Sequence, residues 1–173
     1  MIQEISEFTN FKEILDGRVK TLHPLIHGGI LAKKNNPHHL SQLKKLKIPP
    51  VDLVVVNLYP FDKISSNPKS SENACIENID IGGPSLIRAA AKNFSSVNIL
   101  SSPDDYLEFI KKAESNNNST KLDFRKKLAE LSFHRTANYE SLIANWFSKN
   151  KMNSLTENSS FPLKKISNLR YGE

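Results

Sequence analysis

The segment VDLVVVNLYP, residues 51–60, decides the fold class of this 173-residue chain. It follows two prolines, is continuously apolar from Leu53 to Val56, and is rich in β-branched residues. Such a run is typical of a parallel strand that is buried on both faces. Pro60 ends the strand, because proline cannot donate a hydrogen bond to a sheet ladder. The segment therefore predicts the parallel sheet of an α/β protein.

Helical patterns surround this strand. Residues 36–47 predict a short amphipathic helix, because Asn36 can cap it and Pro37 suits its first turn. Its apolar stripe, which we expect to pack inward, consists of Leu40, Leu43 and Leu46.

The downstream segments alternate between strand and helix, which predicts right-handed βαβ connections. We expect a weak helix at 71–79, a helix from Pro84, a strand at 97–100 and a helix from Ser102 to Lys112. Residues 120–147 then read as one long helical segment. Because it exceeds the common length of a helix, we expect either a break near Thr136 or a helix that projects from the domain.

Composition narrows the class of protein. Apolar residues make up 38% of the chain and charged residues 24%, as in a soluble globular protein. No run approaches the ~18 apolar residues of a membrane span. The single cysteine, Cys75, cannot form an internal disulfide or a thiolate zinc site, and the first residues do not form a signal peptide. Pro24 and Gly28 argue against a helix that would place the nearby histidines on one face, so we expect no metal site. The lone cysteine and the first residues lead us to expect a cytoplasmic protein.

The chain carries 24 basic and 18 acidic residues, a net charge of +6. This excess can attract nucleic acid, an acidic surface or a small phosphorylated substrate. The lysines are scattered as pairs, without the aromatic ladder that single-strand binders use. The pattern favours a phosphorylated small molecule and argues against nucleic-acid and membrane partners, although a basic RNA-binding module remains an alternative.

The loop DGRVKTLHP, residues 16–24, is the first candidate site. It presents Arg18, Lys20 and Thr21 within four residues. Arginine grips a phosphate as a fork and lysine as a point charge, so the loop suits a phosphorylated ligand. A solvated turn with two cations is the alternative.

Two further candidate loops lie at the ends of predicted elements, where open α/β sheets bind ligands. Asn57 and Tyr59 end the predicted strand, although an aromatic residue at this place often belongs to the core. The turn at residues 80–84 has the sequence DIGGP and precedes a helix. Backbone N–H groups of such a turn can hold an oxyanion, but the spacing is neither a dinucleotide fingerprint nor a P-loop.

Lys92 lies at the far end of the helix that follows this turn. Its backbone is ~12 Å along the helix from Pro84, at the usual rise per residue. Only a side chain that leans back, or a neighbouring loop, could bring it to the turn.

Four segments together resemble the inosine monophosphate (IMP) cyclohydrolase domain of bifunctional purine biosynthesis enzymes. They are DGRVKTLHPLIHGGILA (16–32), VDLVVVNLYPF (51–61), ENIDIGGPSLIRAAAKNF (77–94) and LRYGE (169–173). The resemblance implies an α/β fold, a methylglyoxal-synthase-like sandwich with a mostly parallel sheet. It also implies a hydrolase acting on a cyclic amidine, which closes the ring of formamidoimidazole-carboxamide ribotide to give inosine monophosphate with loss of water.

The resemblance assigns roles to ten residues, without cofactor or metal. The expected catalytic residues, with Lys20 stabilising an oxyanion on the formyl group, are Lys20, Tyr59, Asp80 and Lys92. The expected substrate-binding residues are Arg18, Thr21, Asn57, Ile81, Gly82 and Gly83. The expected partners are the purine nucleotide substrate and product, and the full-length family is expected to form a homodimer.

The resemblance also implies departures at both ends. We expect residues 1–147 to form a cyclohydrolase domain whose opening βαβ unit, with its phosphate-binding loops, is missing. A polar linker at 148–160 and the start of a formyltransferase domain at 161–173 should follow, without the transformylase itself. The chain would then be truncated, and a separate fragment could supply the missing strands. A non-catalytic ligand-sensing domain of the same fold remains an alternative.

Overall fold

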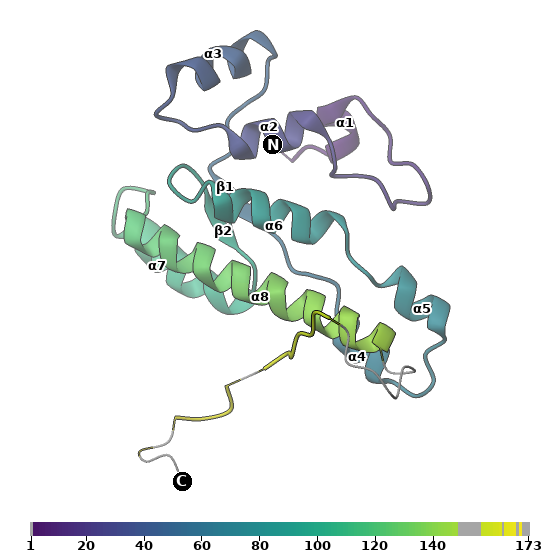
Figure 1. The fold of residues 1–173 in the computed structure, drawn as a ribbon. Coiled ribbons are helices and arrows are strands. Elements are labelled where there is room, and N and C mark those ends of the chain that lie inside the picture. Colours follow the sequence, from purple (N-terminus) through teal and green to yellow (C-terminus); the bar gives the residue numbers. More distant parts are fainter. Residues whose placement is uncertain (1, 149–156, 164, 169, 171–173) are drawn as a thin grey trace. The chain divides into compact units, whose positions relative to one another are not determined.

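The computed structural model describes residues 2–148, 157–163, 165–168 and 170 (Figure 1). The chain divides into two compact units, the first extending to Tyr59 and then from Asp80 to Thr136, and the second comprising Pro60–Ile79 and the chain from Ala137 onward. The elements are α1 (Ile5–Thr9), α2 (Pro24–Leu31), α3 (Pro37–Lys45), β1 (Leu53–Val55), α4 (Phe61–Ser66), α5 (Glu72–Glu77), α6 (Gly82–Lys92), β2 (Asn98–Leu100), the 3-10 helix η1 (Pro103–Asp105), α7 (Tyr106–Glu114) and α8 (Leu122–Ser148).

A parallel pair of strands lies at the centre of the first unit. β1 pairs with β2 in a register that places Leu53 opposite Asn98 and Val55 opposite Leu100. The chain between them includes α6, which packs against both strands (Figure 1). The parallel strands expected near residues 51–59 and 97–100 are confirmed.

The prediction that the strand at β1 is buried on both faces was wrong. Val54 is buried, but Leu53 is 37% exposed and Val55 is 48% exposed. Val54 joins the core together with residues of α2, α6 and α8. Within the described part of the chain, too little packs on the opposite face of β1 to bury its two outer side chains.

Helix α6 forms the middle of this core. Its Ile87, Ala90 and Ala91 are at most 1% exposed. They pack in one cluster with buried residues of α2, β2 and α8. The short alanine side chains let neighbouring elements come close, which fixes α6 and therefore the turn that precedes it.

Helix α3 follows its expected cap but only part of its expected packing. The Asn36 side chain accepts hydrogen bonds from the N–H groups of His38 and His39. Leu43 is buried, whereas Leu40 is 40% exposed and Leu46 is 61% exposed. The prediction that all three leucines pack inward was therefore wrong for two of them. The small cluster around Leu43, which also contains Ala32 and Ile48, covers only one side of the helix.

Helix α8 runs unbroken from Leu122 to Ser148 (Figure 1). No break occurs at Thr136, and the helix instead continues from the first unit into the second. In the second unit, Phe61 packs edge-on against Tyr139 and Trp146. Most of the linker expected at 148–160 lies outside the described residues, so the domain boundaries there stay predictions. None of the described helices is long and apolar enough to span a membrane.

Candidate functional site

A tight hairpin presents the first candidate loop. Ile14 and Val19 form an antiparallel bridge. Between them, Asp16 and Gly17 have φ angles of 54° and 86°, the left-handed values of a type I′ turn. Glycine adopts such an angle without steric cost, which explains the Asp-Gly sequence. The hairpin leaves Arg18 exposed on the surface.

Lys20 forms an ion pair directly after this hairpin. Its Nζ lies 3.0 Å from Glu13 Oε2, and both side chains are about half exposed, at 49% and 53%. The hydrogen bond and the charge of Glu13 raise the pKa of Lys20, with smaller contributions from Glu4 and Tyr59. Lys20 is therefore an ammonium at neutral pH, and Tyr59 lies within its electrostatic range.

Thr21 connects the hairpin to the start of α6. A Cβ placed on Gly82 would lie 2.5 Å from Thr21 Oγ1, which is closer than real side chains approach. The hydroxyl of Thr21 therefore lies against the first residue of α6. Two of the candidate loops, separated by about sixty residues of sequence, meet at this place.

The Asp80 carboxylate holds the first turn of α6. Its Oδ1 accepts a hydrogen bond of 2.7 Å from the Gly83 N–H. A Cβ on Gly83 would lie 2.8 Å from Asp80 Cγ, so a larger residue here would displace this carboxylate. The helix begins at Gly82 rather than at Pro84, and the exposed Ile81 precedes it. This geometry places a negative charge at the positive end of the helix dipole.

Asn57 lies beyond the carboxyl end of β1 and has a partner from another element. Its Nδ2 donates to the hydroxyl oxygen of Tyr106 at 2.8 Å. The same hydroxyl donates to Asn57 Oδ1 at 3.2 Å. Two residues further, Tyr59 is 55% exposed. The carboxyl end of β1 therefore presents an amide held by a phenol and a second, accessible phenol.

Known proteins resemble the whole described region. The family model described as MGS-like domain matches residues 1–85, and the model described as AICARFT/IMPCHase bienzyme matches residues 90–173. The bifunctional purine biosynthesis protein PurH of Oceanobacillus iheyensis is 45% identical over 172 residues, which cover 99% of this chain and 33% of that protein. The chain matches PurH proteins over nearly its full length. The PurH protein of Staphylococcus carnosus is 50% identical over 150 residues, which cover 87% of this chain and 30% of that protein.

The comparisons also support the fold. The chain spans about a third of the length of these PurH relatives, whose name places them in purine biosynthesis. The crystal structure of ForH superposes with a TM-score of 0.72 at 34% identity, covering 84% of this chain and 76% of ForH. The expected methylglyoxal-synthase-like α/β fold is confirmed.

Lys92 does not join the other candidate residues of this PurH-like chain. It ends the 11-residue helix α6, so its backbone is ~15 Å along the axis from Gly82. There it lines an apolar cavity of about 700 Å³ together with Arg88 and Phe133. The catalytic role of Lys92 therefore stays a prediction that rests on the resemblance to the family.

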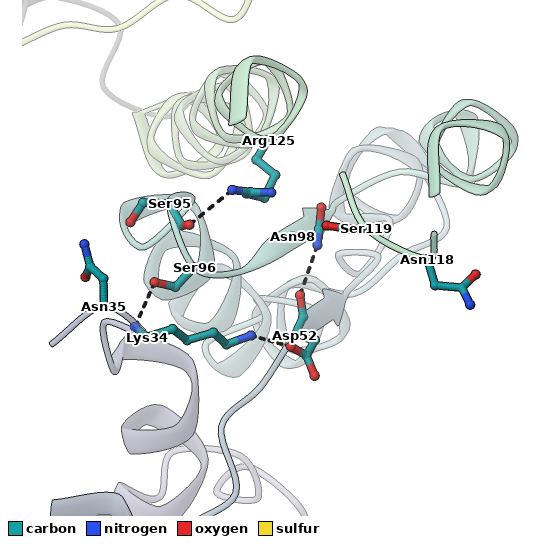
Figure 2. Close-up of a pocket in the computed structure, with 9 residues that line it drawn as sticks. All are labelled: Lys34, Asn35, Asp52, Ser95, Ser96, Asn98, Asn118, Ser119 and Arg125. Carbon is teal, nitrogen blue, oxygen red and sulfur yellow. Dashed lines mark hydrogen bonds and ion pairs between the residues drawn. The ribbon is translucent and has the colours of Figure 1, made fainter. Parts of the chain in front are cut away.

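A second cavity, of about 490 Å³, lies at the amino ends of the strands (Figure 2). Asp52 precedes β1 there, and Asn98 begins β2. Lys34 points toward Asp52 and pairs with it (Figure 2). The Arg125 guanidinium donates to the backbone oxygens of Phe94 and Ser95. The charged groups of this cavity therefore already have hydrogen-bond or ion-pair partners within the chain. The cavity also lies at the end of the sheet opposite to the one where such folds bind ligands.

Sequence reasoning missed two residues of the site. Glu13 could have been found, because a two-residue Asp-Gly turn makes residues 13 and 20 the next pair across the hairpin. Tyr106 could not, because 49 residues separate it from Asn57 and no local pattern joins them.

Proposed function

We propose that this chain carries the IMP cyclohydrolase reaction of PurH proteins. The observation that carries the proposal is the contact between Thr21 and Gly82, because it assembles the RVKT segment and the DIGG turn into one place. Asp80 and Lys20, two of the three charged residues expected in catalysis, lie on these same segments. The ligands are the purine nucleotide substrate and product.

Ring closure needs a cation near the formyl oxygen and a base near the carboxamide. The carboxamide nitrogen attacks the formyl carbon and loses one proton, and the new carbon–nitrogen bond gives a carbinol. Its hydroxyl then takes up a proton and leaves as water, while the formamido nitrogen loses its proton and forms the ring C=N bond. Negative charge develops on the formyl oxygen during the attack. Lys20 suits its stabilisation, because the raised pKa keeps the amine protonated and makes it a poor base.

Asp80 and Tyr59 divide the proton transfers in this proposal. The Asp80 carboxylate, oriented by the Gly83 N–H, accepts the proton of the carboxamide. Tyr59 is 55% exposed and close enough to Lys20 to affect its pKa, so we assign its hydroxyl the delivery of a proton to the departing oxygen. Lys92 retains the role that the resemblance gives it, with no contact here that defines its step.

The remaining residues bind the nucleotide. Arg18 grips the phosphate from the exposed tip of the hairpin. The Asn57 carboxamide contacts the base, and Thr21 with the backbone of residues 81–83 completes the surface around it. In this proposal, these residues determine the affinity for the nucleotide, whereas Lys20 and Asp80 act in ring closure.

The test is conversion of formamidoimidazole-carboxamide ribotide to inosine monophosphate, followed by absorbance. It is run on the 173-residue chain and on the same chain joined to the opening βαβ unit that the resemblance implies. We expect ring closure in at least the joined protein, and its loss in Lys20→Met. Nucleotide binding without ring closure in either protein would instead favour the ligand-sensing alternative. Binding of single-stranded RNA with steep salt dependence, unaffected by inosine monophosphate, would favour the RNA-binding module.

A further inference from the structure

Tyr106 makes an unusual contact with the candidate substrate-binding residue Asn57. Its hydroxyl engages both polar atoms of the carboxamide, accepting from Nδ2 and donating to Oδ1. An asparagine amide has two N–H donors and two acceptor lone pairs. Tyr106 uses one N–H donor and one lone pair of the Asn57 amide, which leaves one N–H and one lone pair for a ligand.

The tyrosine is itself held in place. Its ring packs against the core of the first unit, and its hydroxyl alone reaches Asn57. The preceding residue, Asp105, is only 8% exposed and pairs with both terminal nitrogens of Arg135 on α8, with an Nη2–Oδ1 distance of 2.9 Å. The start of α7 is therefore tied to α8 through a two-point ion pair.

Two serines extend this buried network to the carboxyl end of β2. Arg135 Nη1 donates to Ser101 Oγ at 2.9 Å. Ser101 Oγ lies 2.8 Å from Ser132 Oγ, and both serines are buried. Ser101 directly follows β2, as Asn57 closely follows β1, so the network connects the ends of both strands.

We propose that Tyr106 is a positioning residue for the nucleotide site. Its hydroxyl fixes the plane of the Asn57 carboxamide, so that the free N–H and the free lone pair face the ligand, and the Asp105–Arg135 pair fixes Tyr106. This inference deepens the proposed function and rests on its assignment of Asn57 to nucleotide binding.

Stability alone is a weak reason for this arrangement. Replacing a buried ion pair by apolar residues is often neutral or stabilising, because two charges must lose their water. The hydrogen bonds of an exposed amide likewise contribute little to folding, since water replaces them. What the network supplies is a fixed direction for one amide that would otherwise rotate freely at the surface.

The decisive variant is Tyr106→Phe, which keeps the ring in the core and removes only the hydroxyl. The matched control is Tyr139→Phe, which removes a hydroxyl that donates to the backbone oxygen of Asn78 in the second unit. The first measurement is the ¹⁵N heteronuclear NOE of the Asn57 side-chain amide, assigned by its loss in Asn57→Ala. We expect an ordered amide in the unmodified chain and in Tyr139→Phe, and a mobile one in Tyr106→Phe.

The second measurement is the dissociation constant of inosine monophosphate, determined by calorimetry in a double-mutant cycle. Tyr106→Phe should raise it about threefold to tenfold when Asn57 is present, and not at all in the Asn57→Ala background. An equal effect in both backgrounds, or an Asn57 amide that is equally ordered with and without the hydroxyl, would overturn the proposal. If the unmodified chain binds no nucleotide, the proposed function fails, and the NOE measurement still decides whether Tyr106 positions the amide.

Discussion

Thr21 Oγ1 occupies the space that a side chain on Gly82 would need, at 2.5 Å from the position of its Cβ. The hydroxyl and the glycine come from segments on either side of β1, and their contact is possible only because residue 82 has no side chain. The proposed site therefore depends on the close approach of Thr21 to Gly82. A change that separates the two segments should abolish binding before it abolishes folding.

Gly82→Ala tests this dependence. The new methyl group must push Thr21 away, so we expect the affinity for inosine monophosphate to fall about tenfold or more, with a stability cost of ~1–3 kcal/mol from overpacking. Gly28→Ala is the control, because its Cβ would meet Ile48 Cδ1 at an acceptable 3.4 Å. Calorimetric titration of both variants is the measurement, and equal affinities would refute the contact as a site determinant.

Asp80→Asn separates charge from structure. The asparagine oxygen can still accept the hydrogen bond from the Gly83 N–H, so the unfolding midpoint should change little. Turnover should fall ~100-fold, the scale of a general base. Asp52→Asn, which alters a carboxylate paired with Lys34 in the other cavity, should keep its turnover. Normal turnover in Asp80→Asn would exclude the carboxylate as the base, and Lys92→Ala in the same assay tests the role assigned by resemblance.

Arg18→Lys tests the phosphate grip. Lysine keeps the positive charge but loses the planar fork, so the apparent Michaelis constant should rise and turnover should change much less. Arg88→Lys is the matched control, because Arg88 lies over the Phe133 ring beside the apolar cavity. An unchanged Michaelis constant in Arg18→Lys would count against the assigned role.

Local features of the fold were predictable from the sequence. The cap formed by Asn36 is confirmed, because a side chain that bonds to the backbone two or three residues ahead depends on neighbours alone. The parallel strands were also predictable, from β-branched residues and the alternation with helices. The start of α6 was placed two residues late, at Pro84, because the bond from Gly83 to Asp80 extends the helix.

Features that depend on distant neighbours were not predictable. A continuous apolar run suggested two buried faces for β1, but Val55 is 48% exposed, because burial depends on which layers cover the sheet. The pairing of Asn57 with Tyr106 depends on how α7 is placed beside β1. The family resemblance assigned Thr21 and Gly82 to substrate binding, but no spacing in the sequence predicts that they are in contact.

His27 predicts how stability depends on pH. Its Nε2 is buried and, among the described residues, has no hydrogen-bond partner. Burial lowers the pKa of His27 from its usual 6.5, so the folded protein binds this proton less readily than the unfolded chain. The free energy of unfolding should therefore fall as pH drops below about 6.5, by at most about 1.4 kcal/mol per pH unit for this one proton.

Urea titrations at pH 7.5 and 5.5 measure this effect. His27→Gln should flatten the pH dependence, whereas substitution of the exposed His38 by glutamine should leave it steep. The same slope in His27→Gln as in the unmodified chain would show that other groups cause the acid sensitivity.

In the proposed function, the hairpin, the end of β1 and the start of α6 form one purine-nucleotide site. The most direct test is the unfolding midpoint of the chain with and without inosine monophosphate. Ligand at 100 times its dissociation constant should stabilise the native state by ~2.7 kcal/mol, and the midpoint should rise accordingly. At the same ligand concentration, a tenfold loss of affinity in Gly82→Ala should reduce this stabilisation to ~1.4 kcal/mol, whereas Gly28→Ala should keep it in full. A midpoint that inosine monophosphate leaves unchanged, or raises equally in Gly82→Ala, would contradict the claim.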